Sequence, residues 1–71
     1  MPEAVYKKVE VIGTSTVSIE DAIARGVAAV TPSEPQHHTD WFEVQEIRGA
    51  IRDGKIHEYQ VVFKVGLRLK A

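Results

Sequence analysis

Asp53-Gly54 lies between two long runs in which apolar and polar residues alternate, Trp41 to Arg52 and Lys55 to Lys70. An Asp-Gly pair between such runs is the strongest short-range signal of a β-hairpin, because its tight turn requires positive φ at both central residues. In the second run, apolar residues gather on one face of the predicted strand. We expect that face to supply the core through Tyr59, Val61, Phe63, Val65, Leu67 and Leu69, with His57 joining it near the turn.

The hairpin also predicts which residues pair across the two strands. Uninterrupted counting from Arg52 opposite Lys55 places Trp41 opposite Gly66, Glu43 opposite Lys64, Gln45 opposite Val62 and Ile47 opposite Gln60. Phe42 and Val44 then lie on the core side of the sheet. The other face displays Trp41, Ile47 and Val62 among charged and amide side chains. No further segment is left to cover this face, so it predicts a partner or a ligand.

The residues before the hairpin predict one strand and one helix. Val5 to Ile12 is rich in β-branched residues and predicts a strand, with a turn at Gly13 to Thr16. Ser18, with Asp21 three residues later, is typical of a helix N-terminus. An apolar stripe at helical spacing follows, made of Ile19, Ala22, Ile23, Gly26, Val27 and Val30.

Two prolines interrupt the chain between this helix and the hairpin. Because Pro32 disfavours helical geometry at Thr31, we expect the helix to end near Val30 and Thr31 to Thr39 to form a loop. The predicted order is β-α-β-β, an α+β domain with a three-stranded antiparallel sheet and one helix on one face.

A chain of 71 residues buries too little surface for a large core, and the absence of cysteine removes disulfides as a remedy. Self-association is therefore the leading expectation. The net charge of -1, from interspersed acidic and basic residues, argues against general binding to nucleic acid or a membrane surface. No apolar run is long enough for a membrane span or a signal peptide, so we expect a cytoplasmic protein.

The residue pattern offers little for metal or covalent chemistry. The histidines at 37, 38 and 57 have no metal-ligand spacing, and the serines lack the context of a hydrolase nucleophile. The segment Gly13 to Thr16 resembles a phosphate-binding loop in outline but lacks its lysine and glycine spacing, so we interpret it as structural. We therefore expect no catalytic residue and no metal site.

Four segments together resemble the dodecins, a family of small flavin-binding proteins. They are VYKKVEVIGTS at 5–15, EDAIARG at 20–26, DWFEVQEIRG at 40–49 and EYQVVFKVGLRL at 58–69. The resemblance covers most of the chain and implies a single dodecin-like domain over residues 1–71. It also implies a sheet wrapped partly around the helix and a hollow homododecamer that binds flavins in stacked pairs between subunits.

The resemblance assigns cofactor-binding roles to six residues. Trp41 matches the residue that stacks on the flavin ring, and Gln60 matches the residue that hydrogen-bonds its pyrimidine edge. Arg48 and Arg68 match arginines near the ribityl or phosphate end and near a coenzyme A site, and Tyr6 and Lys7 match nearby positions. In the predicted register Trp41 and Gln60 are about 20 Å apart, so we expect them to meet only across a subunit boundary.

The implied function is storage and sequestration of FMN, riboflavin or FAD, with quenching of flavin photochemistry by Trp41 and no enzymatic turnover. The alternatives are a flavin-dependent reductase that uses the same site, and a structural shell or coenzyme A-binding member with an altered pocket. The proline-containing segment 31–39 departs from the family pattern, which leaves the contacts to coenzyme A open. His37 and His38 in that segment are candidates to replace the lost basic groups.

Overall fold

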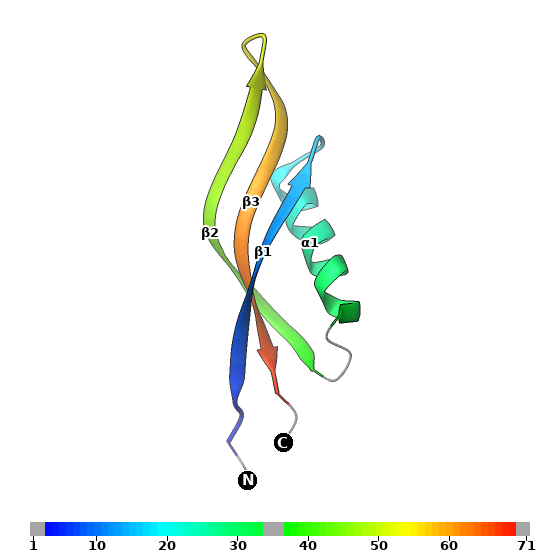
Figure 1. Cartoon of the computed structure of the whole chain (residues 1–71), viewed down its shortest axis with the longest axis vertical. Coiled ribbons are helices and arrows are strands. Elements are labelled where there is room, and N and C mark those ends of the chain that lie inside the picture. Colours follow the sequence, from blue (N-terminus) through cyan, green and yellow to red (C-terminus); the bar gives the residue numbers. More distant parts are fainter. Residues whose placement is uncertain (1–2, 34–36, 70–71) are drawn as a thin grey trace.

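A computed structural model describes residues 3–33 and 37–69 and shows a three-stranded sheet with one helix (Figure 1). The strands lie in the order β1-β3-β2, and both neighbouring pairs are antiparallel. The predicted β-α-β-β order is therefore confirmed. The elements are β1 (Tyr6–Ser15), α1 (Ile19–Ser33), β2 (His38–Arg52) and β3 (Lys55–Arg68).

The molecule is elongated, with principal extents of 56 × 20 × 13 Å. The helix α1 packs mainly on β1 and β3 and touches β2 only slightly. The β2–β3 hairpin extends beyond the helix at one end, while both chain ends lie toward the other (Figure 1). Because β1 pairs with β3 only from Tyr59 onward, the end of the hairpin is a two-stranded ribbon.

The core lies between α1 and the central strand β3. Its four large, fully buried side chains come from alternate positions of β3, as the sequence predicts: Val61, Phe63, Val65 and Leu67. From α1, Ala22 is buried, and Ile23, Val27 and Val30 pack around this cluster with Val9 and Val11 of β1. Tyr59 and Leu69 are only half-buried and His57 is exposed, because they lie toward the two ends of β3, beyond this cluster.

The turn has the predicted geometry. Asp53 and Gly54 have φ values of 54° and 74°, and Arg52 pairs with Lys55. Positive φ at both central residues is the hallmark of a tight turn that matches the twist of the flanking strands. The Asp-Gly interpretation is therefore confirmed.

The predicted register holds next to the turn and from Trp41 to Val44, and it is wrong between these two stretches. Trp41 pairs with Gly66 and Glu43 with Lys64, as expected. Between them and the turn, Gln45 is an extra residue in β2 and His57 is an extra residue in β3. These two β-bulges offset each other, so the pairing is shifted by one residue from Glu46↔Val62 to Ala50↔Glu58. A third irregularity, at Asp40, shifts the pairing of His38 and Thr39 at the start of β2.

The shifted register changes which side chains share a face. Ile47 pairs with Val61 and not with Gln60, so it lies on the helix side of the sheet and not beside Trp41 as expected. Arg48 pairs with Gln60 and shares its face. Uninterrupted pairing would turn Glu46 toward the apolar side, and the bulge at Gln45 avoids burying that carboxylate.

Three predicted boundaries are also wrong. β1 continues through Gly13 to Ser15 where a turn was expected, because these residues still pair with Val61 to Tyr59 of β3. A side chain at Gly13 would meet the Ala22 carbonyl oxygen at 2.0 Å. That glycine serves the close approach of β1 and α1. β2 begins at His38, where its backbone pairs with Arg68, and not at Trp41.

The helix includes Pro32 and ends at Ser33, three residues later than expected. A proline in the last turn removes one hydrogen bond there, where the carbonyl groups can reach water or side chains. The Thr31 hydroxyl donates to the Val27 carbonyl oxygen at 2.9 Å, and the Ser33 hydroxyl donates to that of Val30 at 2.7 Å. The predicted loop 31–39 is therefore shorter, and its residues 34–36 lie outside the described part of the chain.

Candidate functional site

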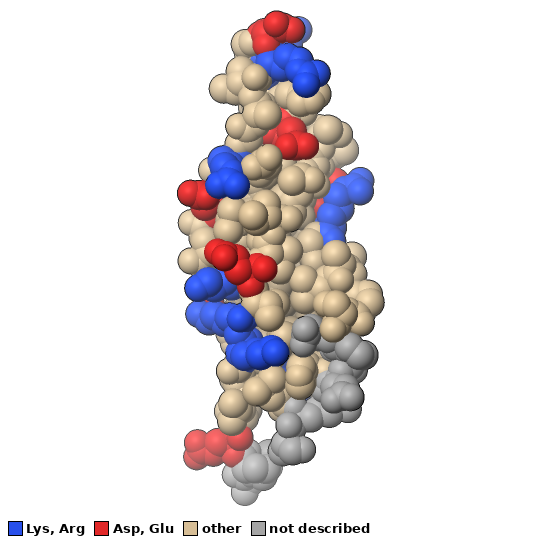
Figure 2. Space-filling view, viewed as in Figure 1, with Lys and Arg blue, Asp and Glu red and all other residues tan. Residues whose placement is uncertain are grey.

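The outer face of the sheet, turned away from α1, carries the aromatic and polar groups that the sequence singled out. Figure 2 shows acidic and basic side chains interspersed along the view drawn there, with uncharged surface between them. The pairing of the three strands defines the outer face as Tyr6, Lys8, Glu10, Ile12, Thr14, His38, Trp41, Glu43, Glu46, Arg48, Ala50, Glu58, Gln60, Val62, Lys64, Gly66 and Arg68.

Trp41 lies flat against the backbone of Gly66, its partner in β3. A side chain at Gly66 would come within 2.3 Å of Trp41 Cε2, so only glycine leaves room for this ring position. The Tyr6 ring meets Trp41 edge-on, with ring centroids 5.1 Å apart and an interplanar angle of 61°. Trp41 remains 38% exposed, so an indole surface faces outward from a fixed support.

Glu43 holds the edge of the indole. Its Oε1 accepts a hydrogen bond from Trp41 Nε1 at 3.4 Å and forms an ion pair with Lys8 Nζ at 2.7 Å. The Lys8 ammonium, and secondly the Trp41 N–H, hold the pKa of Glu43 below its ordinary value. Side chains of β1 and β2, which are not paired with each other in the sheet, are thereby joined across the outer face.

A second polar network surrounds Gln60. Arg48 Nε donates to Gln60 Oε1 at 2.9 Å, and Arg48 Nη1 donates to Glu46 Oε1 at 2.7 Å. Gln60 Nε2 donates to Glu58 Oε1 at 3.1 Å. The bulge at Gln45 makes this network, because it moves Arg48 to the position opposite Gln60.

The structure brings some of the predicted site residues together and separates others. Tyr6 contacts Trp41, and Arg48 contacts Gln60. Arg68 lies on the outer face in the cross-strand row of Tyr6 and His38. Gly66, beneath Trp41, lies six positions along β3 from Gln60, a span of about 20 Å at 3.3 Å per residue.

Lys7 lies on the face opposite Trp41, since it pairs with buried Leu67, and Lys8 takes the corresponding place on the outer face. Sequence reasoning did not include Lys8, Glu43 or Glu58 among the site residues. Alternation along β1 already puts Lys8 on the face of Tyr6, which could have identified it.

The helix side of the sheet carries a separate apolar surface. An open groove of about 870 Å³ runs between α1 and Phe42, lined mostly by Ile23, Ala24, Val27 and Ala28. Nearer the turn, Ile47, Ile51 and Ile56 lie beyond the end of the helix and are 53%, 77% and 64% exposed. This surface is on the opposite side of the sheet from Trp41 and contains almost no polar lining.

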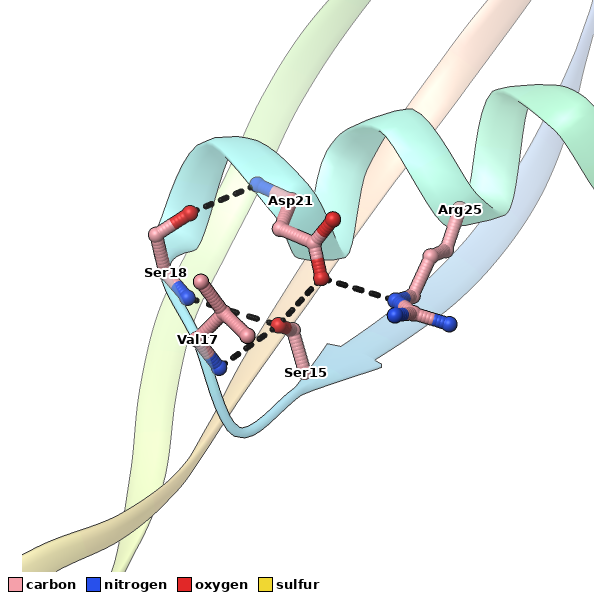
Figure 3. A network of polar contacts seen from close by, with 5 residues as sticks. All are labelled: Ser15, Val17, Ser18, Asp21 and Arg25. Carbon is pink, nitrogen blue, oxygen red and sulfur yellow. Dashed lines mark hydrogen bonds and ion pairs between the residues drawn. The ribbon is translucent and has the colours of Figure 1, made fainter.

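At the start of α1, side chains and backbone N–H groups hydrogen-bond to one another (Figure 3). The Ser15 hydroxyl donates to Asp21 Oδ2 at 2.6 Å and accepts from the backbone N–H groups of Val17 and Ser18 at 2.9 and 3.3 Å. The Ser18 hydroxyl accepts from the Asp21 N–H at 2.9 Å, which is the predicted N-cap. The N–H groups of Val17, Ser18 and Asp21 at the start of the helix are therefore used internally.

Asp21 also pairs with Arg25 at 2.7 Å along the helix. The hydrogen bond from Arg25, and secondly that from Ser15, hold the pKa of Asp21 below its ordinary value. Within residues 3–33 and 37–69, His, Asp and Glu form no group of three that could hold a metal ion. In the same residues, no helix is long and apolar enough to cross a membrane.

The fold and the outer face define a small α+β binding domain that presents a supported indole ring and a separate amide network. Comparison with known proteins gives the family. The dodecin family model matches residues 5–70. Dodecin from Thermus thermophilus is 50% identical over 66 residues, which are 93% of this chain and 93% of that protein.

Comparison with solved structures points to the same family. Dodecin from Streptomyces davaonensis superposes with a TM-score of 0.87 at 37% identity, over 99% of this chain and 100% of the other. The crystal structure of a Thermus thermophilus protein has a TM-score of 0.89 at 48% identity, over 97% of this chain and 98% of the other. The chain therefore belongs to the dodecin family.

Proposed function

We propose that this protein stores and sequesters flavins, FMN, riboflavin or FAD, as stacked pairs between the subunits of a hollow homododecamer. The observation that carries the proposal is the exposed Trp41 ring, held flat on Gly66 and fixed at its edges by Tyr6 and Glu43. A ring supported in this way loses little freedom when a planar ligand stacks on it. Family membership supports the choice of a flavin as that ligand.

The two halves of the flavin site come from different subunits in this proposal. Trp41 stacks on the isoalloxazine ring, and Gln60 of a neighbouring copy bonds its pyrimidine edge through an amide that can both donate and accept. The separation of about 20 Å between them within one chain is too large for one ring system. A monomer is therefore expected not to bind flavin.

The apolar surface on the helix side supports assembly. Ile51 and Ile56 are more exposed than a stable monomer of this size favours, and the groove beside α1 offers a complementary apolar surface. Burial of these surfaces between copies would also supply the stability that a chain of 71 residues lacks. Residues 1–71 act as one domain in this assembly.

The proposed chemistry is protective and not catalytic. A flavin covered by Trp41 on one side and a second flavin on the other leaves no room for a substrate at its reactive nitrogen. Trp41 donates an electron to the photoexcited ring and takes it back, which ends the excited state without net reaction.

Fluorescence titration with riboflavin and FMN tests the proposal. Stoichiometric loss of flavin emission is expected for the natural protein. Trp41→Phe should keep an aromatic surface but leave more residual emission at saturation, because phenyl is harder to oxidise than indole. Glu10→Gln, on the same face and away from Trp41, is the control. Absence of emission loss in the natural protein, or full quenching by Trp41→Ala, would contradict the proposal.

A further inference from the structure

The hydrogen bonds of Gln60 use half of the donor and acceptor positions of its side-chain amide. A glutamine amide has two N–H donors and an oxygen with two lone pairs. Arg48 Nε occupies one lone pair of Oε1, and Glu58 Oε1 takes one N–H of Nε2. One acceptor site and one donor remain.

The same contacts fix which way the amide points. A reversed amide would turn its NH₂ group toward the Arg48 guanidinium and its oxygen toward the Glu58 carboxylate, so both contacts would become repulsive. Both partners are charged, which makes the observed hydrogen bonds stronger than those between neutral groups. Glu46 holds the other side of the guanidinium at 2.7 Å and keeps Arg48 in place.

We propose that Glu58 is a positioning residue that acts through Gln60. Together with Arg48, it presents one oxygen and one N–H outward in a fixed order, which suits a cyclic imide edge with an N–H beside a carbonyl group. This inference rests on the proposed flavin binding, in which Gln60 meets the pyrimidine edge with its oxygen toward the N3–H, and it adds the residue that sets the orientation of that amide. Glu58 itself need not touch the ligand.

The test compares riboflavin with 3-methylriboflavin, which keeps the stacking ring but replaces the imide N–H with a methyl group. The natural protein should bind riboflavin about tenfold or more tightly than the methylated probe, since a fixed oxygen both loses its hydrogen bond and meets the methyl group. In Glu58→Ala the amide can turn, so this preference should fall at least about threefold. Glu58→Gln keeps an acceptor and should restore most of the preference.

Two further variants keep the test decisive. Glu58→Asp retains the charge but withdraws the carboxylate by one methylene, so it should also lower the preference, even if Glu58→Ala fails to assemble. Glu10→Ala removes a carboxylate from the same face, four residues along the ladder from Gln60, and should leave the preference unchanged. Solution mass confirms that each variant assembles.

The outcomes separate the two proposals. If the natural protein binds neither probe, the flavin-binding proposal fails. If it binds riboflavin but Glu58→Ala and Glu58→Asp keep the full preference over 3-methylriboflavin, flavin binding stands and the positioning role of Glu58 is overturned.

Discussion

Trp41 owes its position to the absence of a side chain at Gly66. Gly66→Ala would place a methyl group 2.3 Å from Trp41 Cε2, so the ring must move or the strands must separate. We expect a loss of about 1–3 kcal/mol in the free energy of unfolding, measured by urea denaturation, and weaker riboflavin binding.

A double-mutant cycle provides the control for this prediction. In a Trp41→Ala background the clash is absent, so Gly66→Ala should cost much less than it does in the natural protein. Equal costs in both backgrounds would show that the indole does not rest on Gly66.

Glu43 gives the outer face an acid-sensitive contact. Its pKa in the folded protein is below the ordinary value of 4.5, so the folded state binds its proton less readily than the unfolded state. The stabilising contribution is therefore complete above pH 4.5 and is lost as the pH falls through the lowered value.

Unfolding measurements between about pH 6 and about pH 3 test this sign. Glu43→Gln should show a smaller loss of stability on acidification than the natural protein. Glu10→Gln, an exposed carboxylate on the same face, is the matched control. An equal or larger acid loss in Glu43→Gln would contradict the role given to the Lys8–Glu43 pair.

At the scale of elements, the junction of β1 and α1 depends on one buried hydroxyl. Ser15→Ala would remove the acceptor for the N–H groups of Val17 and Ser18 and a donor to Asp21. We expect a loss of about 1–3 kcal/mol in the free energy of unfolding, because these groups are left without partners. Thr16→Ala, exposed in the same turn, should change it by less than about 0.5 kcal/mol. Similar costs for both would contradict the network.

The sequence predicted each helix and strand of the fold, together with the local features that favour them. The Asp-Gly turn, the N-cap at Ser18 and the buried alternation of β3 are local features, and the structure has all three. The end of α1 was misjudged because a proline disfavours the helix only weakly in its last turn, where exposed carbonyl groups find other donors.

Counting residues outward from the turn could not predict the pairing in the middle of the hairpin. The extra residue in β2 and the extra residue in β3 offset each other, so the pairing beyond them agrees with uninterrupted counting. The sequence nevertheless contains a pattern that indicates both bulges. Val44 and Ile47 are three residues apart, as are Ile56 and Tyr59, and two polar residues separate each pair. Both members of such a pair can face the same side only if one residue between them is extra, as the structure shows at Gln45 and His57. Because Arg48 reaches Gln60 only through this shift, the polar half of the site required the structure.

At the scale of the whole molecule, the hairpin ribbon is the element that most needs a partner. A two-stranded ribbon is marginally stable alone, and this one carries Ile51 and Ile56 in the open. Combined Ile51→Glu and Ile56→Lys substitutions should reduce the solution mass toward that of one chain. They should also abolish riboflavin binding although Trp41 and Gln60 are unchanged. An assembly of unchanged mass would show that the ribbon is not part of the interface.

The central claim is that flavin binds only where subunits meet. Native mass spectrometry of the natural protein with added riboflavin tests it most directly, because one spectrum reports both the number of chains and the bound flavin. We predict a species near twelve times the 7.9 kDa chain mass that carries riboflavin, and no riboflavin on any single chain. A single chain that carries riboflavin, or a twelve-chain species that carries none, would contradict the claim.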